Sequence, residues 1–263
     1  MPESLVKEET FQPPIFSLTG KTALITGGGS GIGFYIAECM VKAGASVVLT
    51  GRREYVLQEA VEKLGGKATY FVNDITRLDT IPALVEAIEK QCGAIDILVN
   101  NAGINMKKFA VEVTDADFDR IVQTNLHAVF SMTRECGKRM IERKSGSIIM
   151  ITSMAALYGI DRVVAYTASK SAVGGMVKAL TTEFSPYNVR INAVAPGFIE
   201  TPMMLTAMNG DPSRRDKAMD RTPMGTWGKP DDIGWAAVFL ASNAAKFITG
   251  VSLPVDGGNS IGF

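Results

Sequence analysis

A tyrosine and a lysine four positions apart form the clearest chemical pair in the sequence. Tyr166 and Lys170 lie in the run YTASK, inside a stretch with helical periodicity, so their side chains share one face of the expected helix. Tyrosine alone titrates at about pH 10, and a neighbouring ammonium lowers that pKa. Such a pair is common on a protein surface, but beside a nucleotide site it is suited to proton exchange with a hydroxyl or carbonyl oxygen.

Glycines fill the turn that follows the first apolar segment. The run TGGGSGIG at residues 26–33 joins an expected strand to an expected helix. Phosphate groups bind where backbone N–H groups and the positive end of a helix dipole can be approached without obstruction by Cβ atoms. The run therefore favours nucleotide binding over an ordinary flexible turn.

The glycine spacing differs from the common dinucleotide-binding pattern and resembles that of the short-chain dehydrogenase/reductase family. Further matches follow in the family's order: NNAG at 100–103, an asparagine at 125, a serine at 153, the YxxxK of 166–170 and Pro-Gly at 196–197. The resemblance covers about residues 18–258. It implies an NAD(P)-dependent oxidoreductase that transfers hydride to or from a small hydroxyl or carbonyl substrate.

The resemblance also implies a role for each catalytic residue. Tyr166 is the general acid/base, and Lys170 lowers its pKa and holds the nicotinamide ribose. Ser153 polarises the substrate oxygen, and Asn125 anchors a water relay behind Lys170. Thr152 rivals Ser153 on sequence grounds, but Ser153 stands at the family's position.

The end of the second expected strand indicates the cofactor. NAD-preferring enzymes carry a carboxylate there for the ribose hydroxyls, and this chain has Thr50-Gly51-Arg52-Arg53 instead. Two guanidiniums favour a 2′-phosphate, hence NADP(H), with NAD(H) as the alternative; two arginines that simply begin a solvated helix are the other interpretation. The cofactor contacts expected from the resemblance are Gly27, Ser30, Gly31, Ile32, Gly33, Arg52, Arg53, Asp74, Ile75, Asn101, Ala102, Gly103, Tyr166, Lys170, Pro196, Gly197, Ile199 and Thr201.

Short apolar runs alternate with amphipathic stretches along the chain. This pattern predicts an α/β fold with a single doubly wound parallel sheet of about seven strands and helices on both faces. Strands are expected at 22–26, 46–49, 68–72, 95–100, 147–152, 190–195 and 251–255, and helices at 32–43, 54–64, 79–91, 115–143, 163–184 and 230–242.

The sequence predicts one catalytic domain at 18–263, preceded by an N-terminal arm at 1–17. Within that domain, the long irregular stretch at 197–229 is expected to be a substrate lid. It contains five methionines, which suit a surface that adapts to its ligand but are also common in ordinary packing.

Composition excludes several classes of function. The 263 residues include 27 basic and 27 acidic ones, a neutral balance that disfavours nucleic acid as a partner. No apolar run reaches the roughly 18 residues of a membrane span, and the acidic, proline-containing start does not look like a secretory signal. Three scattered cysteines (Cys39, Cys92, Cys136) and a single histidine (His127) indicate neither a disulfide framework nor a metal site. A cytoplasmic protein is expected.

The substrate end is less informative. Lys107 and Lys108 follow NNAG, where gluconate 5-dehydrogenase-like members of the family carry a basic pair that could anchor a sugar-acid carboxylate; a solvated loop is the alternative. A 3-oxoacyl-(acyl-carrier-protein) reductase shares the whole catalytic set, and a nucleotide-sensing regulator is disfavoured because that set is intact. Family members pack their two long helices, here 115–143 and 163–184, against a partner, so a homotetramer or homodimer is expected.

Overall fold

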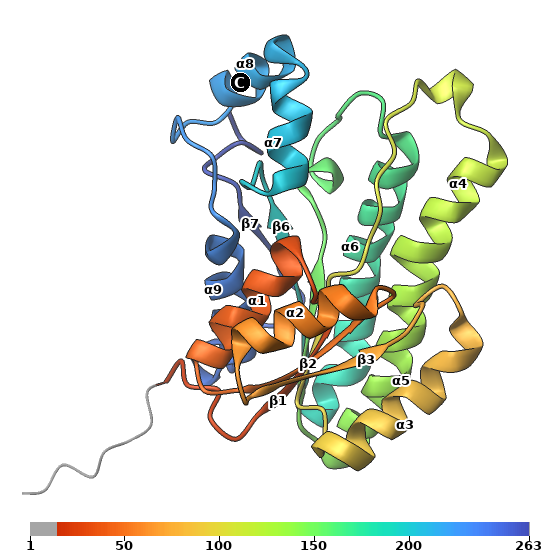
Figure 1. Ribbon diagram of the computed structural model, residues 1–263, viewed down its shortest axis with the longest axis vertical. Helices are drawn as coiled ribbons and strands as arrows, with labels where there is room; N and C mark the ends of the chain where they lie inside the picture. Colours follow the sequence, from red (N-terminus) through yellow and green to blue (C-terminus); the bar gives the residue numbers. More distant parts are fainter. Residues whose placement is uncertain (1–14, 263) are drawn as a thin grey trace, which may run out of the picture.

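The structure is a computed structural model, in which residues 15–262 are described, without the side chains of Met203, Ala207, Asn209 and Arg214. Residues 1–14 of the expected N-terminal arm lie outside the described residues. Within these, seven parallel strands form one sheet in the order β3-β2-β1-β4-β5-β6-β7 (Figure 1). The strands are β1 (Thr22–Thr26), β2 (Ser46–Gly51), β3 (Ala68–Val72), β4 (Ile97–Asn100), β5 (Gly146–Ile151), β6 (Val189–Pro196) and β7 (Ser252–Val255).

Helices cover both faces of this sheet, because the strands are apolar on both sides. Ala23 and Ile25 of β1 belong to one buried cluster, and Leu24 between them belongs to the other. The first cluster includes α1 (Gly31–Lys42), α2 (Glu54–Leu64) and α9 (Pro230–Ala241); the second includes α3 (Ile81–Cys92), α5 (Ala128–Arg143) and α6 (Val164–Phe184). The predicted doubly wound architecture is confirmed, and each strand matches its expected range to within two residues at either end.

The expected helix at 115–143 is interrupted. It consists of α4 (Asp115–Val122), a π-helical turn (Gln123–His127) and α5. Its start is as expected, since Thr114 and Asp117 form a capping box. The π turn holds Asn125, and such turns often occur at functional sites.

The segment 197–229 contains two helices, so the prediction that it is irregular was wrong, whereas its role as a lid stays a prediction. It contains α7 (Pro202–Asn209) and α8 (Pro212–Asp220), which lie beyond the sheet edge at the top of Figure 1. Each helix begins with a proline, which fits the first helical position because the missing N–H has no partner there. The Thr201 hydroxyl caps α7 by accepting a hydrogen bond from the Met204 N–H.

No helix in the described part of the chain has the length and apolar character needed to cross a membrane. The direction in which successive strands are added to the sheet reverses at β1 and β4: β2 and β3 lie beyond β1, whereas β5, β6 and β7 lie beyond β4. In open α/β sheets, ligands bind at the carboxyl ends of the strands around such a reversal. The site is therefore expected beside the residues that follow β1, β4 and β5.

Candidate active site

Tyr166 and Ser153 meet at the carboxyl end of β5. Ser153 lies two residues after the end of that strand, and Tyr166 lies in the first turn of α6. Burial raises the pKa of the Tyr166 phenol, and a hydrogen bond with the Ser153 side chain partly offsets that effect. The hydroxyl of the neighbouring Thr152 already donates its hydrogen bond within the sheet, to the Val194 carbonyl at 3.0 Å.

Lys170 lies beneath this pair, almost completely buried. Its ammonium donates a 2.7 Å hydrogen bond to the Ile151 carbonyl oxygen, and burial lowers its pKa to about 8. The nitrogen is 5.7 Å from the centre of the Tyr166 ring. Lys170 was expected to lower the pKa of Tyr166. In the protein without its cofactor that pKa is raised instead, because the desolvation of the phenol outweighs the effects that favour its ionised form.

Asn125 ties the loop after β4 to the floor of the site. Its side-chain oxygen accepts from the Ile104 N–H at 2.8 Å, and its amide donates to the Ile104 carbonyl at 2.9 Å and to the Ser169 hydroxyl at 3.2 Å. A Cβ atom on Gly103 would lie 3.2 Å from the Asn125 oxygen and 3.5 Å from the Lys170 nitrogen. The NNAG loop is thus held next to the buried lysine.

The glycine turn is locked to the same loop. The Thr26 hydroxyl accepts hydrogen bonds from the backbone N–H groups of Asn101 and Ala102, at 3.0 and 3.1 Å. The Asn101 amide donates to the Thr26 and Gly27 carbonyls. A Cβ on Gly33 would come within 2.4 Å of that amide nitrogen, so only glycine allows this close packing.

The turn also presents open backbone at the start of α1. Gly27 and Gly31 have positive φ angles of 65° and 55°, and among the described residues no atom beyond the adjoining residues and the nearby backbone of α1 lies within 4 Å of the place where a Gly31 Cβ would stand. The side chain of Ser30, which precedes α1, makes no capping hydrogen bond to the helix. Ile32, next in the chain, is half-buried in the first turn of α1. An unobstructed helix N-terminus of this kind fits the phosphates of a dinucleotide.

Arg52 and Arg53 lie beside that turn. The Thr50 carbonyl, at the end of β2, accepts from the N–H groups of Gly27 and Gly28, which joins the two segments. Both arginine side chains are exposed, and Arg53 precedes α2 without capping it. The positive charge therefore borders the glycine turn.

Asp74 and Ile75 follow β3 at the neighbouring sheet edge. The Asp74 carboxylate accepts from the Thr76 hydroxyl at 2.7 Å and from the Thr76 N–H at 3.0 Å. These bonds, together with the charge of Arg52, hold the pKa of Asp74 below its usual value. Both residues are half-buried, so the carboxylate is fixed in a local turn while one edge remains accessible.

A second wall is formed by the loop after β6. Gly197 packs against Asp256, where a Cβ would be only 2.6 Å from the backbone. Ile199 pairs with Gly228 in a parallel bridge, and Thr201 caps α7. Pro196 is the last residue of β6, so all the expected contacts from this region lie at or just after the end of that strand.

These residues fit a nicotinamide dinucleotide. The donor set is an open helix N-terminus, two exposed guanidiniums and a buried ammonium at the carboxyl edge of the sheet, which suits an elongated ligand with phosphates and ribose hydroxyls. In the part of the chain that the structure describes, no group of three or more His, Cys, Asp or Glu could hold a metal ion.

The two lysines after NNAG differ from each other. Lys107 is exposed, whereas Lys108 is half-buried and donates to the Asp117 carboxylate at 2.9 Å. That carboxylate belongs to the capping box of α4, and the lysine lowers its pKa. The Lys108 ammonium is therefore already shared with an acid.

Sequence reasoning missed three residues near the site: Tyr158, Arg221 and Asn259. They come from the Ser153 loop, the residues directly after α8 and the C-terminal turn, and they contact one another. No spacing in the sequence links positions so far apart.

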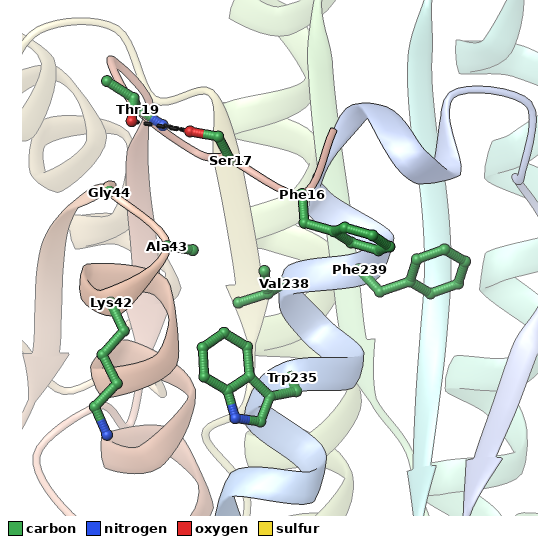
Figure 2. Close-up of a pocket in the computed structure, with 9 residues that line it drawn as sticks. All are labelled: Phe16, Ser17, Thr19, Lys42, Ala43, Gly44, Trp235, Val238 and Phe239. Atoms are coloured by element: carbon green, nitrogen blue, oxygen red, sulfur yellow. Dashed lines mark hydrogen bonds between the residues drawn. The ribbon is translucent and has the colours of Figure 1, made fainter. Parts of the chain in front are cut away.

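A cavity of about 630 Å³ lies elsewhere, between the C-terminal end of α1 and α9. Figure 2 shows Phe16, Trp235 and Phe239 along its apolar side and Lys42 at its margin. None of the expected catalytic or cofactor residues lines it.

Comparisons with known proteins agree with this geometry. A family model described as enoyl-(acyl carrier protein) reductase matches residues 27–260. A 2-dehydro-3-deoxy-D-gluconate 5-dehydrogenase from Bacillus subtilis is 39% identical over 92% of this chain and 96% of that protein. A 3-oxoacyl-(acyl-carrier-protein) reductase from Thermotoga maritima is 38% identical over 92% and 98%. The structure of a gluconate 5-dehydrogenase from Burkholderia cenocepacia in complex with NADP and tartrate matches with a TM-score of 0.90 at 35% identity, covering 95% of this chain and 98% of that one.

Proposed function

The chain belongs to the short-chain dehydrogenase/reductase family, and on this premise we propose that it transfers hydride between NADP(H) and the carbonyl or hydroxyl group of a sugar acid. The observation that carries the proposal is the contact between the Tyr166 phenol and the Ser153 side chain above the buried Lys170. A proton donor, a hydroxyl and a cation meet at the sheet edge that the glycine turn also borders.

The raised pKa of Tyr166 suits the reductive direction. A phenol that keeps its proton at neutral pH can give it to a carbonyl oxygen as hydride reaches the carbon. The bound cofactor supplies or accepts that hydride. Ser153 donates a hydrogen bond to the same oxygen, while the Lys170 ammonium stabilises negative charge on the phenol after proton transfer.

Asn125 supports this arrangement from behind. Its hydrogen bonds with Ile104 hold the NNAG loop against Lys170. We assign it the role of anchoring the water relay that returns a proton to the lysine and tyrosine. Asn125 lies in the π-helical turn, and its side chain is buried there.

NADP(H) is the cofactor that the charges favour. Arg52 and Arg53 border the glycine turn, and a 2′-phosphate there would gain charge-assisted hydrogen bonds that a ribose hydroxyl would not. The gluconate 5-dehydrogenase from Burkholderia cenocepacia was solved with NADP, which supports the assignment. The cofactor would run from these arginines and the Asp74–Ile75 edge, past the glycine turn, to Lys170 and Thr201.

A sugar acid is the substrate class that the relatives favour. The Bacillus subtilis relative is named for a gluconate derivative, and the Burkholderia cenocepacia structure holds tartrate, a hydroxy acid. Lys107 and Lys108, in the loop after NNAG, would provide positive charge for a carboxylate. We propose that the 197–229 segment closes over this substrate as a lid.

A 3-oxoacyl-(acyl-carrier-protein) reductase is the second candidate. The Thermotoga maritima relative supports it at 38% identity, close to the value for the sugar-acid relative. The two functions differ in the substrate alone, because the catalytic set is shared.

The deciding experiment measures oxidation of NADPH, and reduction of NADP⁺, with a panel of keto sugar acids, sugar acids, polyols and acyl-thioester ketones. We expect the highest kcat/KM with 5-ketogluconate or a related acid. A higher kcat/KM with the acyl thioesters would assign the second candidate instead, and turnover of neither class would reject both.

We also propose that one catalytic domain, 18–263, works in the cytoplasm as a homotetramer or homodimer through the long helices. At Gly174 and Gly175 of α6, no atom from elsewhere in residues 15–262 lies within 4 Å of the place where a Cβ would stand, so packing among these residues does not require glycine there. Small residues on this helix would let a partner helix approach closely.

A further inference from the structure

The C-terminal turn carries a fully buried asparagine that joins three segments of the chain. The Asn259 side-chain oxygen accepts a hydrogen bond from the Tyr158 hydroxyl. Its amide donates to the Thr222 hydroxyl at 2.9 Å and to the Ala218 carbonyl at 3.3 Å. Its backbone carbonyl accepts from the Arg221 Nε at 3.0 Å. Every polar atom of this side chain is therefore paired with another part of the fold.

Tyr158 is held on its ring face as well. The Arg221 guanidinium lies 4.1 Å from the ring centre, a distance typical of a cation–π contact. The hydroxyl is also 3.2 Å from the Met154 sulfur. Burial raises the pKa of the Tyr158 phenol, so the hydroxyl keeps the proton that it donates to Asn259.

Tyr158 belongs to the loop that carries Ser153. The Ser153 hydroxyl accepts from the Ala155 N–H at 3.1 Å, and the Tyr158 N–H donates to the Met154 carbonyl at 3.2 Å. The position of the tyrosine ring is thus coupled to the serine by a short, hydrogen-bonded stretch. A displacement of Tyr158 would therefore also displace the Ser153 oxygen.

The other partners of Asn259 lie in the middle of the 197–229 segment. Ala218 is in α8, and Thr222 follows that helix. The two ends of the segment are fixed to each other separately, by the bridge between Ile199 and Gly228 and the ion pair between Glu200 and Lys229. The C-terminal turn thus contacts this segment at α8, which lies at the top of Figure 1.

The C-terminal turn is itself rigid. The Asp256 carboxylate accepts from the N–H groups of Gly258 and Ser260, at 3.0 and 2.7 Å. The Gly257 carbonyl accepts from the Met224 N–H at 3.1 Å. A turn fixed in this way can hold Asn259 at a defined position relative to the sheet.

We infer that Asn259 is a positioning residue for substrate binding, which fixes α8 to the Ser153 loop through Tyr158. The inference rests on the proposed function for the identity of the substrate. With the contact in place, the lid is ordered before the substrate arrives. Without it, part of the binding energy is spent on ordering the lid, so KM rises while kcat changes little.

The test compares Asn259→Ala and Tyr158→Phe with Asn192→Ala. Asn192 is a matched control because it is also fully buried and hydrogen-bonded, to Ile248 and Val251, but lies inside the sheet on β6. We expect both test variants to raise KM for the keto sugar acid about 10-fold, the value of a buried hydrogen bond. Their kcat and their dissociation constant for NADPH should stay within about 2-fold of wild type.

Amide hydrogen exchange gives a readout that does not depend on the substrate. Exchange across residues 202–222 should be faster in Asn259→Ala and Tyr158→Phe than in wild type, and unchanged in Asn192→Ala even where that variant has a lower Tm. Unchanged exchange and KM in both test variants would overturn the inference, as would an equal rise of KM in Asn192→Ala. If wild type turned over no sugar acid, the proposed function would fail while the exchange data still decided the inference.

Discussion

The Lys170 ammonium donates a 2.7 Å hydrogen bond to the Ile151 carbonyl oxygen, at the last residue of β5. Ile151 stands two residues before Ser153, so the sheet holds the lysine close to the serine. This bond does not involve the tyrosine. Because burial removes water from the ammonium, its charged form is disfavoured and the pKa of Lys170 falls to about 8.

This burial predicts a specific pH dependence of stability. Between pH 8 and 10.5 the unfolded chain binds a proton at Lys170 that the folded chain does not, so the free energy of unfolding contributed by this group rises with pH. Below pH 8 the buried charge costs the unliganded fold roughly 3 kcal/mol. We expect Lys170→Met to lose this rise, so its Tm relative to wild type falls as the pH increases from 8 to 10.5.

Lys178→Met is the matched control, since Lys178 is exposed on the same helix. Thermal unfolding of the three proteins, measured without cofactor across this pH range, isolates the contribution of the buried lysine because all other groups titrate equally in each. A constant Tm difference between Lys170→Met and wild type would contradict the prediction.

Removing the phenol hydroxyl should stop the chemistry and spare the fold. Tyr166→Phe keeps the ring beside Lys170 but leaves no proton for the substrate oxygen, so kcat should fall by roughly 10²- to 10⁴-fold. NADPH binding, followed by cofactor fluorescence, should remain within a few-fold of wild type. A Tyr166→Phe variant with more than a tenth of the wild-type kcat would require a different acid.

Much of the fold could be predicted because its determinants are local. The apolar strands, the glycine turn and the capping box of Thr114 and Asp117 all depend on residues close together in the chain. The pairing of Tyr166 with Lys170 is of the same kind, since four positions on a helix bring them to one face. Ser153 was expected beside this pair from the family resemblance, and the structure shows the contact of its side chain with the Tyr166 phenol.

What could not be predicted depends on contacts between distant segments. The pKa of Tyr166 reflects burial by the whole site rather than the charge four residues away. Lys108 is paired with Asp117, nine positions further along the chain in the first turn of α4. The Asn259–Tyr158 contact spans 101 positions, and neither residue lies in a motif that the sequence singled out.

Arg52 and Arg53 should set the choice of cofactor. Replacing both with alanine removes charge-assisted hydrogen bonds to the 2′-phosphate, so KM for NADPH should rise about 10- to 100-fold, with little change for NADH. Lys63→Ala, at the opposite end of α2 and equally exposed, serves as the control and should alter neither value. Steady-state kinetics with both cofactors would contradict the assignment if KM for NADPH and NADH rose together.

The two lysines after NNAG should contribute to the binding of an acidic substrate through their charge. Lys107 is exposed, and the Lys108 ammonium is held 2.9 Å from the Asp117 carboxylate. We expect Lys107→Ala to raise KM for an acidic keto sugar roughly 2- to 5-fold, the range for a partly exposed ion pair, and to leave a neutral ketone of similar size unchanged. Lys108→Ala should in addition lower Tm, because Asp117 loses a partner at the capping box of α4. Kinetics with the acidic and the neutral substrate at two salt concentrations separate these effects, since screening weakens only the charged contact. Equal changes in KM for both substrates would show that neither lysine anchors a carboxylate.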